Sequence, residues 1–200
     1  MPNFDKLAAF NLAKEKLIKS GCSEENTLGI IEGILDAEFS GIKSHGFHYL
    51  PIYCNHLKIG KIKGDANSSF EKISNSALKV DADNGFAHSA IKLGFPEFLE
   101  MSSKEGISCM SVYNSYNCGV LGFHTKHIAE KGYLGLGFTN APASIAPQGG
   151  VKAVVGTNPF SIAVPYQGSA SIIIDQSASV VAKSEISVRA KSGELIPEGW

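Results

Sequence analysis

Apolar side chains near the amino end recur at the three- and four-residue spacing of an α-helix. Residues 4–20 are predicted to form one helix that ends before Gly21, with apolar positions at Phe4, Leu7, Ala8, Leu12, Leu17 and Ile18. A second helix is predicted to start after Ser23, a residue type that caps helices, with Glu24 and Glu25 where the helix dipole favours negative charge. Its predicted buried face consists of Leu28, Ile31, Leu35 and Phe39.

A third, short helix is predicted from Pro51 to about Ile59, because the missing N–H of proline costs nothing in a first helical turn. Gly41 is a typical stop signal for the second helix. Residues 41–50 are therefore predicted to be a loop between two helices. This loop holds the triplet Ser-His-Gly, with His45 at its centre.

Farther along the chain, short apolar runs alternate with helical periodicity. Strands are predicted over residues 77–81, 107–113, 134–139, 160–164 and 172–175. Helices are predicted over residues 86–105, 119–131 and 180–191, with Pro96 forcing a kink or a break in the first of them. Asn84 and Gly85 predict a turn. The alternation indicates an α/β fold with a layered sheet, preceded by an amino-terminal helical segment over residues 1–70.

The composition is that of an ordinary globular protein, with 44% hydrophobic and 18% charged residues and a net charge of −1. So small a charge gives no general attraction to nucleic acid or to a membrane. The four cysteines form no Cys-x-x-Cys pair, which favours a reducing compartment. Because the sequence shows neither the apolar run of a signal peptide nor a segment of membrane-spanning length, we expect a cytoplasmic protein.

His45 is the first candidate for chemistry. An imidazole gains and loses a proton near neutral pH, so it suits a reaction in which an alcohol loses a proton as a hydride leaves. The alternative, which the triplet alone favours, is a loop histidine that only makes hydrogen bonds. A metal site is a third interpretation, because His48, Cys54 and His56 follow closely. Their spacing fits no tight zinc pattern, so no metal is predicted.

The common phosphate-binding motifs, G-x-G-x-x-G after a strand and G-x-x-x-x-G-K-[ST], are absent from the sequence. A different stretch, residues 175–179, follows an apolar strand and precedes a predicted helix. Its hydroxyl and amide groups could hold a phosphate or a ribose at the amino end of that helix. The alternative is plain helix capping by Ser177 or Ser179. Residues 156–159, Gly-Thr-Asn-Pro, are typical of a turn.

The order of several motifs along residues 4–200 adds a more specific signal: SHG, LP-x-Y, DADNGFA, YNS-x-x-x-G, TNAP, GTNPFSIAVP, ID-x-x-x-S-x-VA and G-x-x-IPEGW. This order resembles the malate/L-lactate dehydrogenase family of the LDH2/MDH2 type, which includes sulfolactate, ureidoglycolate and diketogulonate enzymes. The resemblance implies a mixed-sheet NAD(P)-binding α/β domain that is not a Rossmann fold, here over residues 71–200 and incomplete. It also implies NAD or NADP as cofactor, a small 2-hydroxy or 2-keto acid as substrate, and a homodimer.

The resemblance also assigns roles to residues of this chain. Those matched to catalytic positions are His45, Tyr53 and Asn117. Those matched to positions facing the nicotinamide nucleotide are His45, Asn140, Thr157, Asn158, Asp175, Gln176, Ser177 and Ser179.

Three positions depart from the family pattern. Tyr49 replaces an arginine suited to gripping a carboxylate, Asn117 replaces a histidine that accepts a proton in some members, and Glu185 replaces a lysine. Family members also continue well past the IPEGW motif. The sequence therefore leaves two hypotheses open: an NAD(P)-dependent dehydrogenase acting on a CH–OH group, or a truncated or decayed homologue that serves as a non-catalytic nucleotide-binding or interaction subunit.

Overall fold

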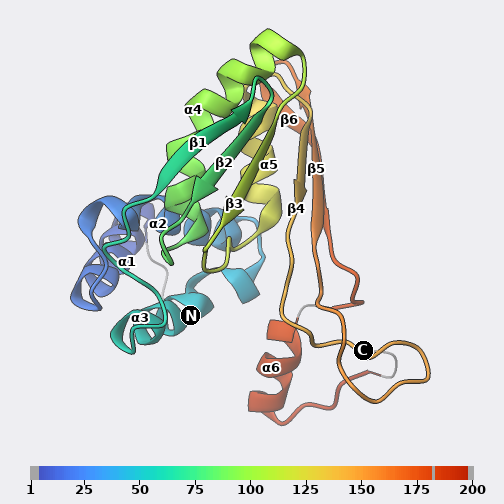
Figure 1. Cartoon of the computed structure of the whole chain (residues 1–200). Helices are drawn as coiled ribbons and strands as arrows, with labels where there is room; N and C mark the ends of the chain where they lie inside the picture. Colours follow the sequence, from blue (N-terminus) through green and yellow to red (C-terminus); the bar gives the residue numbers. More distant parts are fainter. Residues whose placement is uncertain (1–4, 182, 198–200) are drawn as a thin grey trace. The chain divides into compact units, whose positions relative to one another are not determined.

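The computed structural model describes residues 5–181 and 183–197 and divides the chain into two compact units, Met1–Gly119 and Val120–Trp200. Each unit has its own helices and its own sheet (Figure 1). The expected division into domains at residue 70 stays a prediction. Phe4, Ala182 and residues 198–200, which end the IPEGW motif, lie outside the described residues.

The first unit begins with the three predicted helices, α1 (Lys6–Lys19), α2 (Glu24–Phe39) and α3 (Leu50–Lys58). Side chains cap the first two as helix physics requires, since Asp5 accepts the Ala8 N–H and Ser23 accepts the Asn26 N–H. The expected loop between α2 and α3 contains two short 3-10 helices, η1 (Lys43–His45) and η2 (Phe47–Tyr49).

The buried face of α2 differs from the predicted one. Leu28 is 37% exposed and Phe39 is 65% exposed, whereas Ile31 and Leu35 are buried as predicted. The reason is that α2 packs against both α1 and α4 (Ala87–Glu105), which shifts and widens its inner face. The buried side chains of α2 include Thr27, Ile30, Ile31, Ile34 and Leu35.

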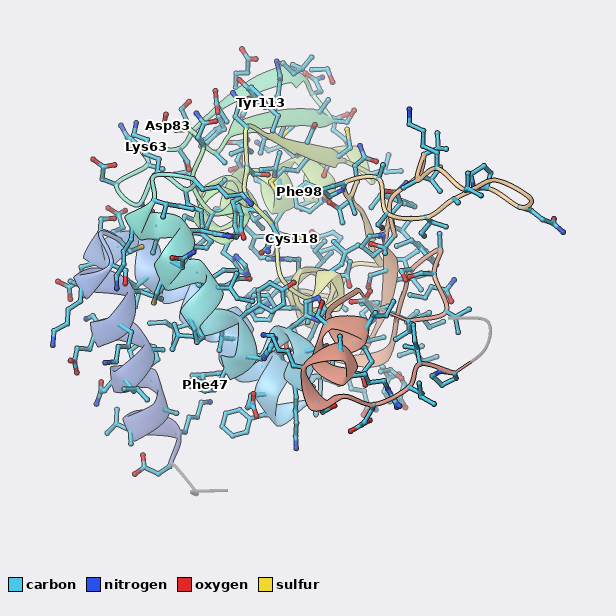
Figure 2. All side chains as sticks on the ribbon, turned by 90° about the horizontal axis from the view of Figure 1, so that it is seen from below. Phe47, Lys63, Asp83, Phe98, Tyr113 and Cys118 are labelled. Carbon is cyan, nitrogen blue, oxygen red and sulfur yellow. The ribbon has the colours of Figure 1, made fainter. Side chains whose placement is uncertain are left out.

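The core of the first unit is a cluster of apolar side chains from α1, α2 and α3. Leu17, Ile30 and Ile31 are fully buried in it, and Tyr53 and Phe86 extend it toward the candidate site. Phe47, labelled in Figure 2, packs against this cluster from η2. The cluster therefore supports the segment that carries His45 and Tyr53.

A three-stranded mixed sheet completes the first unit. Its strands are β1 (Ser69–Ser74), β2 (Ala77–Asp81) and β3 (Cys109–Tyr113), with β1 antiparallel and β3 parallel to β2. The parallel connection runs through α4, which lies against the sheet (Figure 1). The sequence analysis missed β1, because all six of its residues are exposed and its edge position requires no apolar alternation.

The helix α4 continues through Pro96, so the alternative of a break at this residue is wrong. A proline removes the hydrogen bond to the carbonyl four residues earlier, which here belongs to Lys92. Both Lys92 and Pro96 are exposed, so water can satisfy the carbonyl that the proline leaves without its helical donor.

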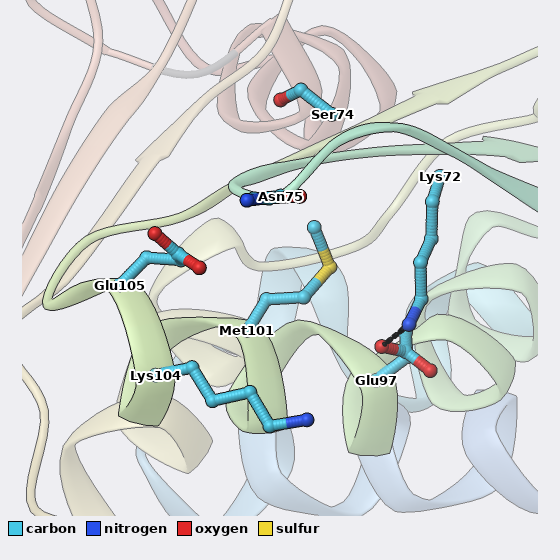
Figure 3. A pocket seen from close by; sticks show the side chains of 7 residues that line it. All are labelled: Lys72, Ser74, Asn75, Glu97, Met101, Lys104 and Glu105. Atoms are coloured by element: carbon cyan, nitrogen blue, oxygen red, sulfur yellow. Dashed lines mark ion pairs between the residues drawn. The ribbon is translucent and has the colours of Figure 1, made fainter.

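A shallow hollow of about 410 Å³ lies between the end of β1 and the carboxyl half of α4 (Figure 3). Its lining mixes both signs of charge, and Lys72 pairs with Glu97 at 2.5 Å. None of the predicted site residues lines it. The hollow thus lies apart from the candidate chemistry.

The second unit contains an antiparallel sheet in the order β4 (Gly135–Phe138), β5 (Phe160–Tyr166) and β6 (Ser169–Gln176). The helix α5 (Leu121–Glu130) packs on this sheet, where the buried hydroxyls of Thr125 and Ser161 share a hydrogen bond of 2.7 Å. The predicted helix over residues 180–191 is α6 (Lys183–Ser192).

We predict that Gly94→Ala destabilises the first unit. A Cβ atom at this position would lie 2.8 Å from Met110 Sδ and 2.9 Å from Val80 Cγ2, so α4 or the sheet must move. Overpacking of this kind costs about 1–3 kcal/mol, against a gain of about 1 kcal/mol in helix propensity. A lower midpoint of chemical denaturation is therefore expected for Gly94→Ala. Ser103→Ala, at an exposed position of the same helix, is the control, and a midpoint that rises for Gly94→Ala would contradict the packing argument.

Candidate active site

The segment around His45 is held by a carboxylate of α2. Glu38 Oε2 accepts the backbone N–H of Phe47 at 3.0 Å, and a Cβ atom on Gly46 would come within 2.1 Å of the same oxygen. A side chain at position 46 would therefore displace the Glu38 carboxylate from this contact. Within the triplet, Ser44 Oγ lies 3.1 Å from His45 Nδ1, close enough for a hydrogen bond that orients the imidazole.

Tyr49, at the position of the family's arginine, forms a stack with His45. The two rings are nearly parallel, with an interplanar angle of 15° and centroids 5.4 Å apart. On its other side Tyr49 contacts Tyr53, with ring centroids again 5.4 Å apart. Burial raises the pKa of the Tyr49 phenol, so the group is neutral at neutral pH. The position that would carry a cation in the family thus presents an uncharged aromatic ring.

Tyr53 is almost completely buried, and its hydroxyl bonds to a residue 64 positions away in the sequence. It donates to Asn117 Oδ1 at 2.8 Å. Desolvation raises the pKa of Tyr53, so the phenol keeps its proton. The same Asn117 oxygen accepts the Gly119 N–H at 3.3 Å. With two donors at its oxygen, the Asn117 side chain has its amide hydrogens left for donation.

A second contact joins the same two segments. His56, three residues after Tyr53 on α3, places Nδ1 2.6 Å from the hydroxyl of Tyr116, the residue before Asn117. The rings of His56 and Tyr116 meet edge to face, with centroids 5.6 Å apart. The sequence analysis missed both roles. Its only usable signal was the three-residue spacing of Tyr53 and His56 on one predicted helix.

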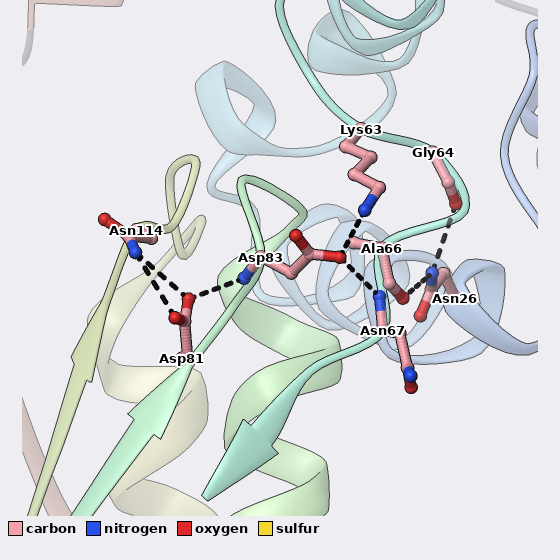
Figure 4. Close-up of polar contacts among 8 residues, drawn as sticks. All are labelled: Asn26, Lys63, Gly64, Ala66, Asn67, Asp81, Asp83 and Asn114. Atoms are coloured by element: carbon pink, nitrogen blue, oxygen red, sulfur yellow. Dashed lines mark hydrogen bonds and ion pairs between the residues drawn. The ribbon is translucent and has the colours of Figure 1, made fainter.

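The DADNG stretch, residues 81–85, fixes the loop that carries Asn117. Asn114 donates from Nδ2 to both carboxylate oxygens of Asp81, at 3.2 and 3.3 Å (Figure 4). Its carbonyl accepts the Asn84 N–H at 2.8 Å. The Tyr116 N–H donates to the carbonyl of Gly85. Asn84 and Asn114 both have a positive φ, 60° and 49°, a conformation that asparagine tolerates better than most residues.

The same stretch is tied on its other side to the loop before β1. Lys63 and Asp83 form an ion pair of 2.5 Å, and Asp83 also accepts the Asn67 N–H at 3.0 Å (Figures 2 and 4). Both bonds lower the pKa of the Asp83 carboxyl, with the Lys63 bond as the larger cause. Asn26 of α2 donates to the carbonyls of Gly64 and Ala66. The network therefore links α2, the loop before β1 and the loop that carries Asn117.

The residues matched to nucleotide contacts, apart from His45, belong to the second unit. Hydrogen bonds join them where β4 ends, β5 begins and β6 ends. Asn158 Oδ1 accepts the N–H of Ala141, the residue after Asn140, at 2.9 Å, and the Ala178 N–H donates to the Thr157 carbonyl at 2.8 Å. Gln176 pairs in register with Phe160, the residue that opens β5. The structure thus gathers these segments at one end of the sheet of the second unit.

Asp175 and the two serines make local bonds at that end. Asp175 Oδ2 accepts the N–H of Gly122, in the first turn of α5, at 2.7 Å, which makes this carboxylate a cap of α5. Ser177 and Ser179 lie within hydrogen-bond distance of each other through their hydroxyls, at 3.0 Å, and Ser179 Oγ donates to the Val181 carbonyl. Both hydroxyls thus make their bonds within residues 177–181, before α6 begins at Lys183, and their role in binding a nucleotide stays a prediction.

Neither a metal centre nor a membrane span is found in the part of the chain that the structure describes. No three histidine, cysteine, aspartate or glutamate side chains within residues 5–181 and 183–197 come together as a metal-binding group. Over the same residues, no helix has the length and apolar character needed to cross a bilayer.

Comparison with known sequences gives the same family as the motif order. The (2R)-3-sulfolactate dehydrogenase (NADP(+)) of Chromohalobacter salexigens is 36% identical over 167 residues, which cover 84% of this chain and 50% of that protein. A malate dehydrogenase of Pyrococcus abyssi is 32% identical over 195 residues, which cover 96% of this chain and 52% of that protein. The chain thus spans about half the length of these relatives.

Solved structures of related proteins share the fold. The Δ1-piperideine-2-carboxylate reductase of Pseudomonas syringae pvar. tomato matches 98% of this chain and 59% of its own with a TM-score of 0.93 at 25% identity. A malate dehydrogenase of Entamoeba histolytica matches 100% of this chain and 55% of its own with a TM-score of 0.91. The family described as malate/L-lactate dehydrogenase matches residues 4–200. The chain belongs to the malate/L-lactate dehydrogenase family.

Proposed function

We propose that this chain is part of an NAD(P)-dependent oxidoreductase that interconverts a small 2-hydroxy acid and its 2-keto acid. The observation that carries the proposal is a continuous set of contacts in the first unit. His45 stacks on Tyr49, Tyr49 contacts Tyr53, and Tyr53 bonds to Asn117. The relatives named malate dehydrogenase and sulfolactate dehydrogenase support the reaction class.

The second unit would hold the dinucleotide. The donor set there fits such a ligand, because the hydroxyls of Ser177 and Ser179 and the amide-bearing Asn140 suit ribose and phosphate oxygens. Asp175 would act indirectly, through the amino end of α5 that it caps. When bound, a nicotinamide supplies or takes up the hydride of the reaction. The remaining chemistry, binding and proton transfer, falls to side chains of this chain.

In the direction of reduction, the substrate carbonyl gains a hydride at carbon and a proton at oxygen. We assign the proton to the imidazole of His45, which Ser44 and Tyr49 orient. The neutral phenol of Tyr53 fixes the Asn117 amide, which donates a hydrogen bond to the substrate and transfers no proton. Without an arginine at position 49, neutral hydrogen-bond donors rather than a guanidinium group would hold the substrate carboxylate.

The finer assignments extend the same proposal. Lactate or a close analogue belongs to the proposed substrate class, the assembly would be a homodimer, and the location would be cytoplasmic. The second candidate function is a non-catalytic nucleotide-binding or interaction subunit. Two observations favour it. The amide of Asn117 cannot transfer a proton. Glu185 has the opposite charge to the lysine of the family pattern, and its Oε1 lies 3.7 Å from Arg189 Nε.

We predict that the chain binds NADH or NADPH and that the two serines contribute to binding. Loss of hydroxyl contacts to a phosphate or ribose costs about 1–2 kcal/mol, so Ser177→Ala combined with Ser179→Ala should weaken the affinity roughly tenfold. Fluorescence titration with each dinucleotide measures it. Ser169→Ala, at the opposite end of β6, is the matched control. If neither dinucleotide binds at millimolar concentration, the cofactor proposal is wrong.

We predict that His45→Ala abolishes turnover and leaves the fold intact, because His45 lies in a partly exposed 3-10 helix outside the apolar core. General acid–base groups contribute on the order of a hundredfold or more in rate. The assay is NAD(P)H oxidation with a panel of 2-keto acids in the whole protein. His48→Ala, three residues away, should stay within a few-fold of the unchanged protein. Full activity in His45→Ala would leave the triplet as a simple turn.

We predict that restoring the two family side chains raises the rate. Tyr49→Arg supplies a cation for the substrate carboxylate, and Asn117→His supplies a group that transfers protons. The doubly substituted protein should therefore have at least a tenfold higher kcat/KM for 2-keto acids, by the usual size of such contributions. A fall in kcat/KM for both single variants would mean that this site has adapted to its neutral side chains.

A further inference from the structure

Two hydrogen bonds join α3 to the loop of residues 114–119. Tyr53 and His56 lie three residues apart on α3, so they face the same way. Their partners, Asn117 and Tyr116, are consecutive in the loop. Tyr53 donates to the loop, and His56 Nδ1 shares a hydrogen with the Tyr116 hydroxyl. One helix face therefore holds two adjacent loop residues at once.

The direction of the His56–Tyr116 bond follows from the protonation of its two groups. Burial and the nearby Lys61 lower the pKa of His56, so its imidazole is neutral at neutral pH. Burial raises the pKa of Tyr116, so its phenol keeps its proton. A neutral imidazole has one donor and one acceptor nitrogen, and we assign the tautomer with its hydrogen on Nε2, in which Nδ1 accepts from the Tyr116 hydroxyl. The contact at 2.6 Å is at the short end of the hydrogen-bond range.

Tyr116 is also fixed by its ring and its backbone. Its ring stands edge to face against Tyr53 and Phe86, with centroids 5.9 and 5.7 Å away. Its N–H donates to the Gly85 carbonyl at 2.8 Å. The ring, the amide and the hydroxyl thus hold Tyr116 from three sides. Asn117, as the next residue, has its Cα position set by this anchor.

We propose that His56 is a positioning residue that, through the Tyr116 hydroxyl, latches the 114–119 loop against α3 and so keeps the Asn117 amide on Tyr53. Only the effect of the latch on turnover rests on the proposed function. The latch itself is a property of the first unit. It gives a role to His56 and to Tyr116, neither of which is a named residue of the LP-x-Y and YNS-x-x-x-G stretches quoted above.

The latch has a defined pH dependence. Protonation turns His56 Nδ1 into a donor, so the bond reverses: Nδ1–H donates to the Tyr116 oxygen and the Tyr116 hydrogen turns away. The groups that face His56 are Lys61 from the turn after α3 and Tyr116 from the loop. Because burial and Lys61 disfavour the charged imidazole, the pKa of His56 is lower in the folded than in the unfolded chain, so the stability that this group contributes is complete at neutral pH and falls as the pH drops below about 6.5.

The test compares Tyr116→Phe, which removes only the hydroxyl, with Tyr166→Phe at an exposed position of the second unit as control. Hydrogen–deuterium exchange of the amides of residues 114–119 should become roughly threefold to tenfold faster in Tyr116→Phe at pH 7, as expected for one lost hydrogen bond. His56→Phe should have the same effect. His56→Gln, which keeps an acceptor, should restore much of the protection.

The effects of the two substitutions on exchange should also not add. In the double variant His56→Phe with Tyr116→Phe, exchange should be no faster than in either single variant, since both remove the same bond. Where turnover is measurable, each single variant should lower kcat with little change in KM, and His56→Phe should in addition remove the acid-side decline that comes from titration of His56. Unchanged exchange in Tyr116→Phe, or effects that add in the double variant, would overturn the proposal. If the unchanged protein shows no turnover, the proposed function fails, while the exchange experiment still decides the latch.

Discussion

The buried hydroxyl of Tyr53 is the constraint on which the candidate site depends. A phenol oxygen that is removed from water without a partner costs a few kcal/mol, so the fold must bring an acceptor to it. The acceptor is Asn117, from a loop 64 residues later in the chain. The packing of α3 in the core and the placement of the Asn117 loop therefore depend on each other. Closing the core around Tyr53 without the loop would leave its hydroxyl without this acceptor and would carry that cost.

Other contacts of the site follow the same logic, in which a side chain of one element holds the backbone of another. Glu38 of α2 accepts the Phe47 N–H beside His45. Asp81 holds Asn114 at the start of the Asn117 loop, and Asp175 caps α5 in the second unit. These carboxylates do not resemble catalytic acids, because each is engaged with a donor of the protein itself. Their effect is to make irregular segments as well determined as the helices around them.

The sequence predicted local structure better than long-range contacts, for a physical reason. Periodicity and capping are set by neighbours in the chain, so α1, α2 and α3 were predicted close to their observed bounds. Burial depends on which elements pack together. α1 and α4 cover a different face of α2 from the predicted one, which leaves Leu28 and Phe39 at the surface. The edge strand β1 has no inward-facing pattern, and so it gave no signal.

The candidate site shows the same limit. Motif order located His45, Tyr53 and Asn117, but no pattern in the sequence showed that Tyr53 bonds to Asn117 or that His56 bonds to Tyr116. Such pairs, separated by 60 and 64 residues, exist only once the α3 face meets the loop. Asp175 illustrates the converse, since a residue matched to a ligand position can serve that position through a helix end that it caps.

Two residues of the first unit, Tyr49 and Asn117, depart from the family pattern in the same way, because both are uncharged. A stacked phenol at position 49 and an amide at position 117 replace a cation and a titratable imidazole, and both replacements are neutral at working pH. On the proposed function, such a site would hold its ligand by hydrogen bonds, which require closer positioning than attraction between charges because they weaken steeply with misalignment. The bonds of Tyr53 and His56 to the loop provide that positioning. On the proposed function, the second contact between α3 and the loop would therefore supply the precise placement of Asn117 that such hydrogen bonds require.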